Sequence, residues 1–422
     1  MLDIKFIREN KDIVQMGAKK KRVEIDIDAL IALDDTRLVL LKEIEVLRTE
    51  VNRVSNDIGR DQDPALKVQL IEEMRVVKDE IKAKEEKLKT IMNEWQLMML
   101  HVPNVPDMTV PEGNTDEENQ EVKVWGEKPV FDFEPKDHLE IMNALKMVDF
   151  ERGTKVHGFR GYFLIGDGAM LSMAIWNHAM EFFTSRGYTF VLPPAIARKE
   201  NFIGTAMIPQ SEEDLYKTQT GDYLAGTAEV PIMGMHAGEV LDKASLPIKY
   251  LGFSPCYRLE AGSHGKDVKG LIRVHEFYKF EQVILCEANH EVSVKFHEEL
   301  TKNTEEFFES MNLPYHKVIN CGGDLGLGQV KKYDLEAWVP KENKYREVAS
   351  ASYFHDFQTR RLGIRYKDEA GKMQYAHSLN NTAIATPRAL VSLIENCQQA
   401  DGTIRIPDVL RKYMGGREFI GK

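Results

Sequence analysis

The sequence predicts an α+β protein, in which an antiparallel two-helix coiled-coil arm precedes a larger domain with a mostly antiparallel β-sheet flanked by helices. The first observation is an apolar heptad pattern between residues 35 and about 98. The second is a mixture of helix-like and β-rich stretches from about residue 136 onward, in which strands and helices do not alternate one by one. A chain of 422 residues has room for two or three domains, and we place the boundary between residues 1–103 and 104–422.

The composition is that of a globular protein in aqueous solution, with 43% hydrophobic and 29% charged residues. The first ten residues mix charged and apolar side chains, which argues against the core of a signal peptide. No long apolar run indicates a membrane span, so we expect a cytoplasmic protein. The formal net charge of −11 argues against a protein that coats nucleic acid, but it allows a local basic surface.

The cysteines do not form a metal or disulfide pattern. None of the four belongs to a CxxC pair, so a structural zinc site is not expected. In a chain of this length they are best interpreted as reduced core residues: Cys256, Cys286, Cys321 and Cys397.

The arm is predicted from apolar residues that recur at spacings of three and four. The seam comprises Leu40, Ile44, Leu47, Val51, Val54 and Ile58 in the first half, and Met74, Val77, Ile81, Leu88, Ile91, Trp95 and Met98 in the second, with Lys84 as one polar position. Residues 59–64 have turn composition. A two-helix hairpin cannot bury a wide core, so it should project from a larger body. We expect a short helix and a loop before it, and a proline-rich linker at residues 102–113 after it.

One face of the second arm helix is basic. At about 100° per residue, five cationic side chains fall within about 80° of one another on the helical wheel: Lys67, Arg75, Lys78, Lys82 and Lys89. Such a stripe is often only a solvated face, and a two-helix arm is often an oligomerisation coiled coil. A stripe of one sign along a rigid rod is also what contact with a phosphate backbone requires. The residues alone leave these interpretations open.

The second region contains three helix-like stretches and several β-rich ones. The predicted helices are 168–186, 291–311 and 387–399, and the predicted strands include 189–192, 281–286, 333–339 and 363–366. Because single helices do not separate successive strands, a doubly wound parallel sheet is disfavoured. We expect a large, mostly antiparallel sheet with helices against it.

Common nucleotide-binding motifs are missing from the sequence. It contains no GxxxxGK[ST] run and no protein-kinase motif set, and Gly166-Asp-Gly168 lacks the third glycine of GxGxxG. Strand-like alternation instead places Arg258 and Glu260 on one side of a strand. After a basic, glycine-rich loop at residues 261–270, a second strand would carry on one face Arg273, His275, Phe277, Lys279 and Glu281. This pair is either the floor of a site for an anionic nucleotide or an exposed hairpin with ion pairs, and the segment alone does not decide between them.

The same segment closely resembles a known motif. Residues 256–281, CYRLEAGSHGKDVKGLIRVHEFYKFE, resemble motif 2 of class II aminoacyl-tRNA synthetases in its seryl form. Residues 187–194 resemble motif 1, the dimer element, and residues 378–399 resemble motif 3. Further agreement with the seryl-tRNA synthetase family lies in Thr227-Ala-Glu229, in residues 345–352 and 401–411, and in the arm, so the resemblance covers essentially the whole chain.

The resemblance implies an enzyme, a class II serine–tRNA ligase. It would activate L-serine with ATP to seryl-adenylate and transfer serine to the 3′ end of tRNA(Ser), with tRNA(Sec) as a further candidate. It implies Mg²⁺ with ATP, a homodimer, no membrane, and tRNA contacts through the arm stripe and the motif 2 loop.

The resemblance also assigns residues to subsites. Arg258 and Arg388 would be catalytic, holding the α-phosphate with the serine carboxylate and the γ-phosphate, respectively. Glu347 and Ser350 would hold Mg²⁺. The ATP-binding residues would be Arg258, Leu259, Glu260, Val274, Phe277, Glu347, Val348, Ala349, Ser350 and Arg388. The serine-binding residues would be Thr227, Ala228, Glu229, Glu281, Asn380 and Thr382.

Three other interpretations compete with this one. Another class II enzyme, such as a threonyl or prolyl synthetase, is disfavoured by the arm and by the run Thr227-Ala-Glu229. A paralogue that charges a carrier protein would lack the arm, and an inactive one should have lost its charged ligands. A coiled-coil scaffold with an incidental globular domain would show no serine-dependent exchange of pyrophosphate into ATP.

Overall fold

The computed structural model describes residues 1–60, 63–261 and 269–422. The chain divides into two compact units. One comprises residues 2–19 and 23–103, and the other comprises residue 1, residues 20–22 and residues 104–422. We call them the arm unit and the sheet unit.

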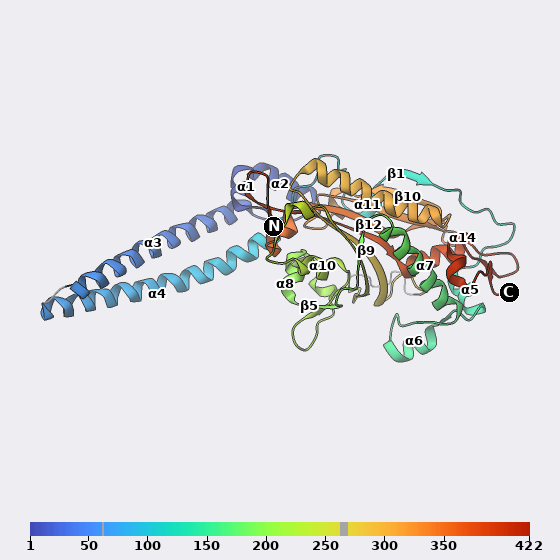
Figure 1. Cartoon of the computed structure of the whole chain (residues 1–422), viewed down its shortest axis with the longest axis horizontal. Coiled ribbons are helices and arrows are strands. Elements are labelled where there is room, and N and C mark those ends of the chain that lie inside the picture. The colour runs from blue at the N-terminus through green and yellow to red at the C-terminus, as the bar shows by residue number, and fades with distance from the viewer. Residues whose placement is uncertain (61–62, 262–268) are drawn as a thin grey trace. The chain divides into compact units, whose positions relative to one another are not determined.

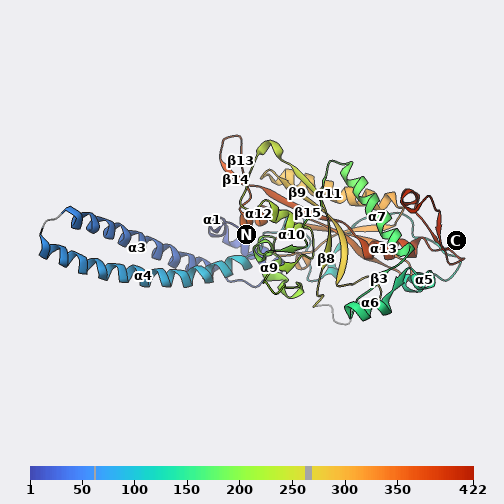
Figure 2. The ribbon, with the colours of Figure 1, turned by 60° about the horizontal axis from the view of Figure 1, so that its bottom comes forward.

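The arm unit consists of four helices: α1 (Ile4–Glu9), α2 (Lys11–Lys20), α3 (Ile27–Arg60) and α4 (Pro64–His101). α3 and α4 run side by side as a long hairpin (Figures 1 and 2). The hairpin is longer than the predicted range of 35–98, because Asp26 Oδ1 accepts the backbone N–H of Ala29 and starts the first helix earlier. Two short helices precede the hairpin, whereas the sequence suggests one helix and a loop.

The predicted seam is confirmed. Its residues are buried or half-buried along both helices, while the positions between them are mostly exposed. The polar seam position, Lys84, places its Nζ 2.8 Å from Glu43 Oε2 on the opposite helix. A second ion pair across the hairpin joins Arg48 Nη2 to Glu85 Oε1 at 2.6 Å. In the basic stripe, Lys67 is half-buried and the other four cations are exposed.

The sheet unit is built on an eight-stranded sheet with the order β1-β10-β11-β12-β15-β9-β8-β4. Every neighbouring pair is antiparallel except β8 and β4, which are parallel, so the mostly antiparallel sheet is confirmed. The strands are β1 (Gln120–Trp125), β4 (Thr189–Val191), β8 (Ile248–Tyr257), β9 (Glu276–Cys286), β10 (Tyr315–Ile319), β11 (Lys331–Val339), β12 (Lys344–His355) and β15 (His377–Ala385).

Helices and short strands complete the unit. The helices are α5 (His138–Ala144), α6 (Phe150–His157), α7 (Asp167–Thr184), α8 (Lys199–Gly204), α9 (Met207–Gln210), α10 (Glu229–Met235), α11 (His290–Ser310), α12 (Phe357–Leu362), α13 (Thr386–Asn396) and α14 (Asp408–Arg411). The short strands are β2 (Val148–Asp149), β3 (Phe163–Leu164), β5 (Ile196–Ala197), β6 (Tyr223–Leu224), β7 (Val240–Leu241), β13 (Arg365–Lys367), β14 (Met373–Tyr375), β16 (Ile404–Arg405) and β17 (Phe419–Ile420).

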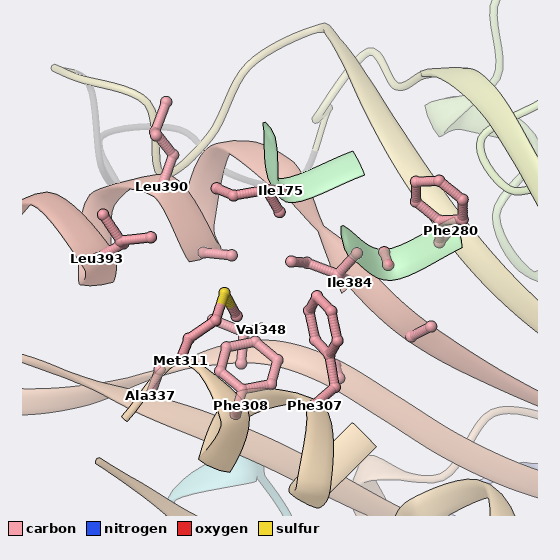
Figure 3. Close-up of a cluster of buried hydrophobic side chains, with 14 of the residues drawn as sticks. Ile175, Phe280, Phe307, Phe308, Met311, Ala337, Val348, Ile384, Leu390 and Leu393 are labelled. Carbon is pink, nitrogen blue, oxygen red and sulfur yellow. The ribbon is translucent and has the colours of Figure 1, made fainter. Parts of the chain in front are cut away.

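One hydrophobic core joins the sheet to α7, α11 and α13. Ile175 of α7 and Leu390 of α13 lie near Phe280 and Ile384 of the sheet, and Phe307 of α11 closes the cluster (Figure 3). All five side chains are at most 1% exposed. Burial of apolar area on this scale fixes β9 and β15 in place, and these two strands carry much of the site described below. Cys256, Cys286 and Cys321 are also buried, and all four cysteines are free, as predicted.

The first strand of the motif 2 segment is shorter than predicted. β8 ends at Tyr257, so the prediction that Arg258 and Glu260 share one face of a strand is wrong. The backbone leaves the sheet because the N–H of Leu259 donates to the backbone oxygen of Asp214 at 2.9 Å. Glu260 then has a φ of 54°, in the left-handed region that non-glycine residues seldom adopt.

The second strand is also shorter than predicted. β9 begins at Glu276, so Arg273 and His275 precede it and do not alternate along it. The alternation holds for the remaining three residues of the predicted face, Phe277, Lys279 and Glu281. None of the helices that the structure describes is both long and apolar enough to cross a membrane.

Candidate functional site

A cavity at the end of β8 gathers most of the residues expected to bind ATP. Its lining includes Arg258, Glu260, Val274, Phe277, Glu347, Val348, Ala349 and Arg388. Two expected residues lie outside the lining. The Leu259 side chain is 38% exposed, and Ser350 lies on β12, paired with Asp334 of β11.

At one side of this cavity, Arg388 of α13 pairs with Glu347 of β12. Arg388 Nη1 lies 3.1 Å from the backbone oxygen of Glu347 and 3.1 Å from its Oε2, and Arg388 Nε donates to the backbone oxygen of Ile272. Partial burial raises the pKa of the Glu347 carboxyl, but the charges of Arg388, Lys332 and Arg258 outweigh this effect and hold the pKa below its usual value. Glu347 is therefore an ionised carboxylate, with oxygens of the kind that bind a cation, beside a guanidinium.

Two arginine side chains lie near Glu260. Arg273 Nη1 lies 2.9 Å from Glu260 Oε2, and the largely buried Arg160 approaches the same oxygen at 4.0 Å. The guanidinium of Arg258 lies 5.5 Å from the centre of the Phe277 ring and donates to the backbone oxygen of Gly226. An aromatic face, a carboxylate and guanidinium groups in one cavity can bind a base and its phosphates.

Beside the cavity, four side chains, three buried and one half-buried, form a polar cluster on β9, β15 and the loop before α10. Lys279 Nζ lies 2.5 Å from Glu281 Oε2, and it donates to the hydroxyls of Thr227 at 2.9 Å and Thr382 at 3.2 Å. Both hydroxyls in turn donate to Glu281 Oε2, at 3.2 and 3.3 Å. Thr227, Glu281 and Thr382 were all expected in the serine subsite, whereas Lys279 was not.

Glu229 is the second buried carboxylate at this end of the site. Gln358 of α12 donates to Glu229 Oε1 at 2.6 Å, and Ser378 donates to Gln358 Oε1 at 2.8 Å. Burial, reinforced by the charge of Glu281, raises the pKa of Glu229 to about 7, while hydrogen bonds from Gln358 and Asn380 oppose the rise. Ser378, Asn380 and Thr382 are alternate residues of β15, which explains how the strand reaches both carboxylates.

Close packing between β8 and the start of α10 brings Glu229 toward the cluster around Glu281. Gly252 of β8 pairs with Glu281 of β9. A Cβ atom at Gly252 would lie 2.8 Å from the Cβ of Ala228 and 2.5 Å from Ile232, so only glycine lets the start of α10 approach the strand this closely. Ala228, an expected serine-site residue, is fully buried in that contact.

Two residues of the site were not assigned from the sequence. Lys279 belongs to the charged face that the alternation predicted, but the residues gave no reason to place its ammonium against the serine-site oxygens. Gln358 lies in a short helix and carried no sequence signal. The pairing of Thr382 with Glu281 and of Asn380 with Val283 across β15 and β9 brings these groups together.

The donors expected for Mg²⁺ fit that ion only in part. A carboxylate oxygen of Glu347 and the hydroxyl of Ser350 are oxygen ligands, which Mg²⁺ prefers. Within the described ranges, no group of three or more His, Cys, Asp or Glu residues could hold a metal ion. Two oxygen ligands would leave the other positions of an octahedral ion to substrate phosphates and water. The motif 2 loop, expected to contact tRNA, falls largely on residues 262–268, which lie outside the described residues.

Two family models match the chain. Residues 1–106 match the seryl-tRNA synthetase N-terminal domain, and residues 216–397 match the tRNA synthetase class II core domain (G, H, P, S and T). The serine–tRNA ligase of Deinococcus radiodurans is 45% identical over 100% of this chain and 99% of its own. That of Geotalea uraniireducens is 42% identical over 100% of both.

Solved structures agree with these matches. The seryl-tRNA synthetase of Pyrococcus horikoshii, complexed with ATP, aligns with a TM-score of 0.90 and 37% identity over 100% of this chain and 99% of its own. The cytoplasmic enzyme of Naegleria fowleri, in complex with AMP, aligns with a TM-score of 0.87 and 33% identity over 100% and 98% of the two chains.

Proposed function

Since the chain belongs to the seryl-tRNA synthetase family and catalyses the ATP-dependent attachment of serine to tRNA, we propose that the cavity beside Arg388 binds ATP and that the cluster around Glu281 binds serine. The observation that carries this assignment is that the two sites are continuous. Lys279 and Thr382 of the cluster line the same cavity as Arg258 and Arg388. Two substrates bound there would meet at Arg258.

In the first step, the serine carboxylate attacks the α-phosphorus of ATP and pyrophosphate leaves. A planar guanidinium binds two oxygens at once, so Arg258 would hold the α-phosphate and the carboxylate together and reduce their repulsion. Phe277 would stack on adenine, and Glu260 would accept a hydrogen bond from the adenine amino group. Arg388 would bind the γ-phosphate. Mg²⁺ bound through Glu347 and Ser350 would neutralise phosphate charge.

The serine subsite would use both buried carboxylates. Glu229, when ionised, would attract the serine ammonium, and Glu281 would accept the hydrogen bond of the serine hydroxyl. In the second step the 3′-terminal ribose hydroxyl of tRNA attacks the seryl carbonyl and releases AMP. The contribution of the protein to both steps is positioning and charge neutralisation rather than covalent catalysis.

The assembly around this site is also part of the proposal. Residues 1–103 would form a tRNA-binding domain and residues 104–422 the catalytic domain. The arm stripe and the motif 2 loop would contact tRNA(Ser), and the same arm would receive tRNA(Sec). Exposed apolar side chains on α7, which precedes motif 1, and within motif 1 directly after β4 support a homodimer through this element: Met170, Met173, Met180 and Leu192. Because its substrates are ATP and tRNA, the enzyme would work in the cytoplasm.

Exchange of labelled pyrophosphate into ATP tests the site without tRNA. We expect exchange with serine, and none above background with threonine or proline. Serine-dependent charging of tRNA(Ser) should follow under the same conditions. Exchange that depends on threonine or proline instead would contradict the assignment of the Glu281 cluster.

A further inference from the structure

The hydrogen bonds of Glu281 are unevenly distributed between its two oxygens. Lys279 Nζ and the hydroxyls of Thr227 and Thr382 all reach Oε2, at 2.5, 3.2 and 3.3 Å. Among the residues that the structure describes, every donor to this carboxylate is directed to that oxygen. The Glu281 side chain is only 1% exposed, so Oε1 is left as an acceptor inside the pocket.

The lysine also determines the direction of the two threonine hydroxyl groups. An ammonium has three N–H donors and no acceptor, and Lys279 directs them to Glu281, Thr227 and Thr382. Each threonine oxygen therefore accepts from Lys279 and turns its single proton toward Glu281. The oxygen of Thr227 accepts a second hydrogen bond, from the N–H of Glu229 at 3.3 Å, so both of its lone pairs are used.

The polar atoms of the pocket that can form further hydrogen bonds are acceptors. Glu281 Oε1 and one lone pair of the Thr382 oxygen are available, whereas both threonine protons are committed. The pocket holds two carboxylates and one ammonium, so with both carboxylates ionised a single negative charge is left for a ligand. A small ligand with one ammonium and one donating hydroxyl complements this arrangement.

We propose that Lys279 is the positioning residue that sets serine specificity: it fixes Glu281 Oε2 and both threonine hydroxyls, so that Oε1 accepts the hydrogen bond of the substrate hydroxyl. The inference rests on the proposed serine subsite. Without the ammonium, Glu281 would be a buried carboxylate with no positive partner, and the two threonine hydroxyls would lose the donor that orients them. A Glu281 carboxylate that is no longer held in place and freely rotating hydroxyls would not distinguish serine from alanine.

The test compares Lys279→Met with wild type in pyrophosphate exchange, using serine and alanine as separate substrates. We expect kcat/KM for serine to fall about 100-fold, mainly through KM, because a site built for a hydroxyl loses its oriented acceptor. The value for alanine should change by less than about threefold, since alanine does not use Oε1.

Lys249→Met is a matched control. Lys249 lies outside the pocket on the neighbouring strand β8, and its Nζ is 2.7 Å from Glu299 of α11. Removal of the Lys249 charge should therefore leave the ratio of serine to alanine activation unchanged. Equal losses for serine and alanine, or a serine loss that falls on kcat with KM unchanged, would overturn the proposal. If wild type itself shows no serine-dependent exchange, the proposed function fails instead.

A folding check separates positioning from a structural role. ATP should raise the melting temperatures of Lys279→Met and wild type by similar amounts. If the single variant does not fold, the neutral pair Lys279→Met with Glu281→Gln removes both buried charges together. That double variant should fold, bind ATP and activate serine no better than Glu281→Gln alone. Failure of the double variant to show ATP-dependent stabilisation would give Lys279 a purely structural role and refute the inference.

Discussion

Arg388 and Glu347 form an ion pair at one side of the cavity proposed to bind ATP, with Nη1 of the arginine 3.1 Å from Oε2 of the glutamate. The arginine comes from α13 and the glutamate from β12, so the pair connects motif 3 to the edge of the site. A bound phosphate would share the guanidinium with the carboxylate. In the proposed site, this arrangement would keep the arginine in place before substrate arrives and would leave an ionised oxygen for a cation that accompanies ATP.

Substitution of Arg388 should therefore impair ATP use more than serine use. We expect Arg388→Ala to lower kcat/KM for ATP, with a loss of transition-state stabilisation on the order of 3 kcal/mol, since it removes a charged donor directed at a phosphate. The KM for serine should change little. Exchange kinetics with each substrate varied in turn measure both effects. Arg411→Ala, which removes an arginine paired with Asp408 in α14, is the control, and a similar loss in both variants would remove Arg388 from the site.

Glu281→Ala should nearly abolish serine activation while the fold is retained. The substitution removes the acceptor of the substrate hydroxyl and leaves Lys279 as a buried ammonium without its carboxylate partner. Together these effects should cost about 3 kcal/mol or more in transition-state binding. Circular dichroism and ATP-dependent stabilisation check the fold, and exchange measures the activity. Serine activation near the wild-type level would show that the pocket assignment is wrong.

Serine binding should weaken as the pH falls through about 7, because burial raises the pKa of Glu229 to about 7. Below that pH the carboxyl is neutral and no longer attracts the serine ammonium. Gln358 donates to Glu229 and stabilises its ionised form, so Gln358→Leu should move this limb to higher pH. The dependence of serine KM on pH in both proteins is the measurement, and identical profiles would argue against the role of Glu229.

The same group predicts a trade-off between stability and binding. Between the ordinary glutamate pKa of 4.5 and about 7, the folded protein binds a proton at Glu229 that the unfolded chain has released. Stability therefore falls as the pH rises through this window and stays lower above it. Glu229→Gln should raise the melting temperature above pH 7 relative to wild type and still impair serine activation. A lower melting temperature at that pH would contradict the raised pKa.

Deletion of residues 35–98, with a short linker joining the ends, should separate the two halves of the reaction. Every proposed ATP and serine ligand lies between Thr227 and Arg388, so exchange should persist, whereas tRNA charging should fall sharply. Equal loss of both activities would indicate a folding role for the arm, and unchanged charging would exclude it from tRNA recognition.

Reversal of the basic stripe should reproduce the deletion without loss of structure. Glutamate at positions 67, 75, 78, 82 and 89 should weaken tRNA binding. The salt dependence of binding should become shallower, by about 0.9 in log–log slope for each phosphate that the arm no longer neutralises. Lys87→Glu is the control, because Lys87 is exposed on the opposite side of α4. An unchanged salt dependence would mean that the stripe does not contact phosphates.

The sequence predicted the parts of the fold that local pattern determines. The seam from Leu40 to Met98 was readable because spacings of three and four place side chains on one helical face. The end of β8 at Tyr257 was not, since it depends on hydrogen bonds from the following residues to the distant Asp214. The role of Gln358 was hidden for the same reason, because its partners Glu229 and Ser378 come from other elements.

Within the site, the resemblance supplied most of the residues and the structure supplied their connections. Arg258, Glu260 and Arg388 follow from matching motifs and line one cavity. The sequence placed Lys279 on one face of a predicted strand. Its contact with Thr382 could not be predicted, because it requires the register of β15 against β9. Register between distant strands is set by packing of the whole sheet, which a single sequence does not display.

The central claim is that serine and ATP meet at Arg258, between the cluster around Glu281 and the cavity beside Arg388. Binding of a non-hydrolysable sulfamoyl analogue of seryl-adenylate, measured by calorimetry, tests it most directly, because one molecule would span both subsites. We predict tight binding to wild type that weakens by about 100-fold or more in both Arg258→Ala and Glu281→Ala. Binding that is unchanged in both variants would contradict the account.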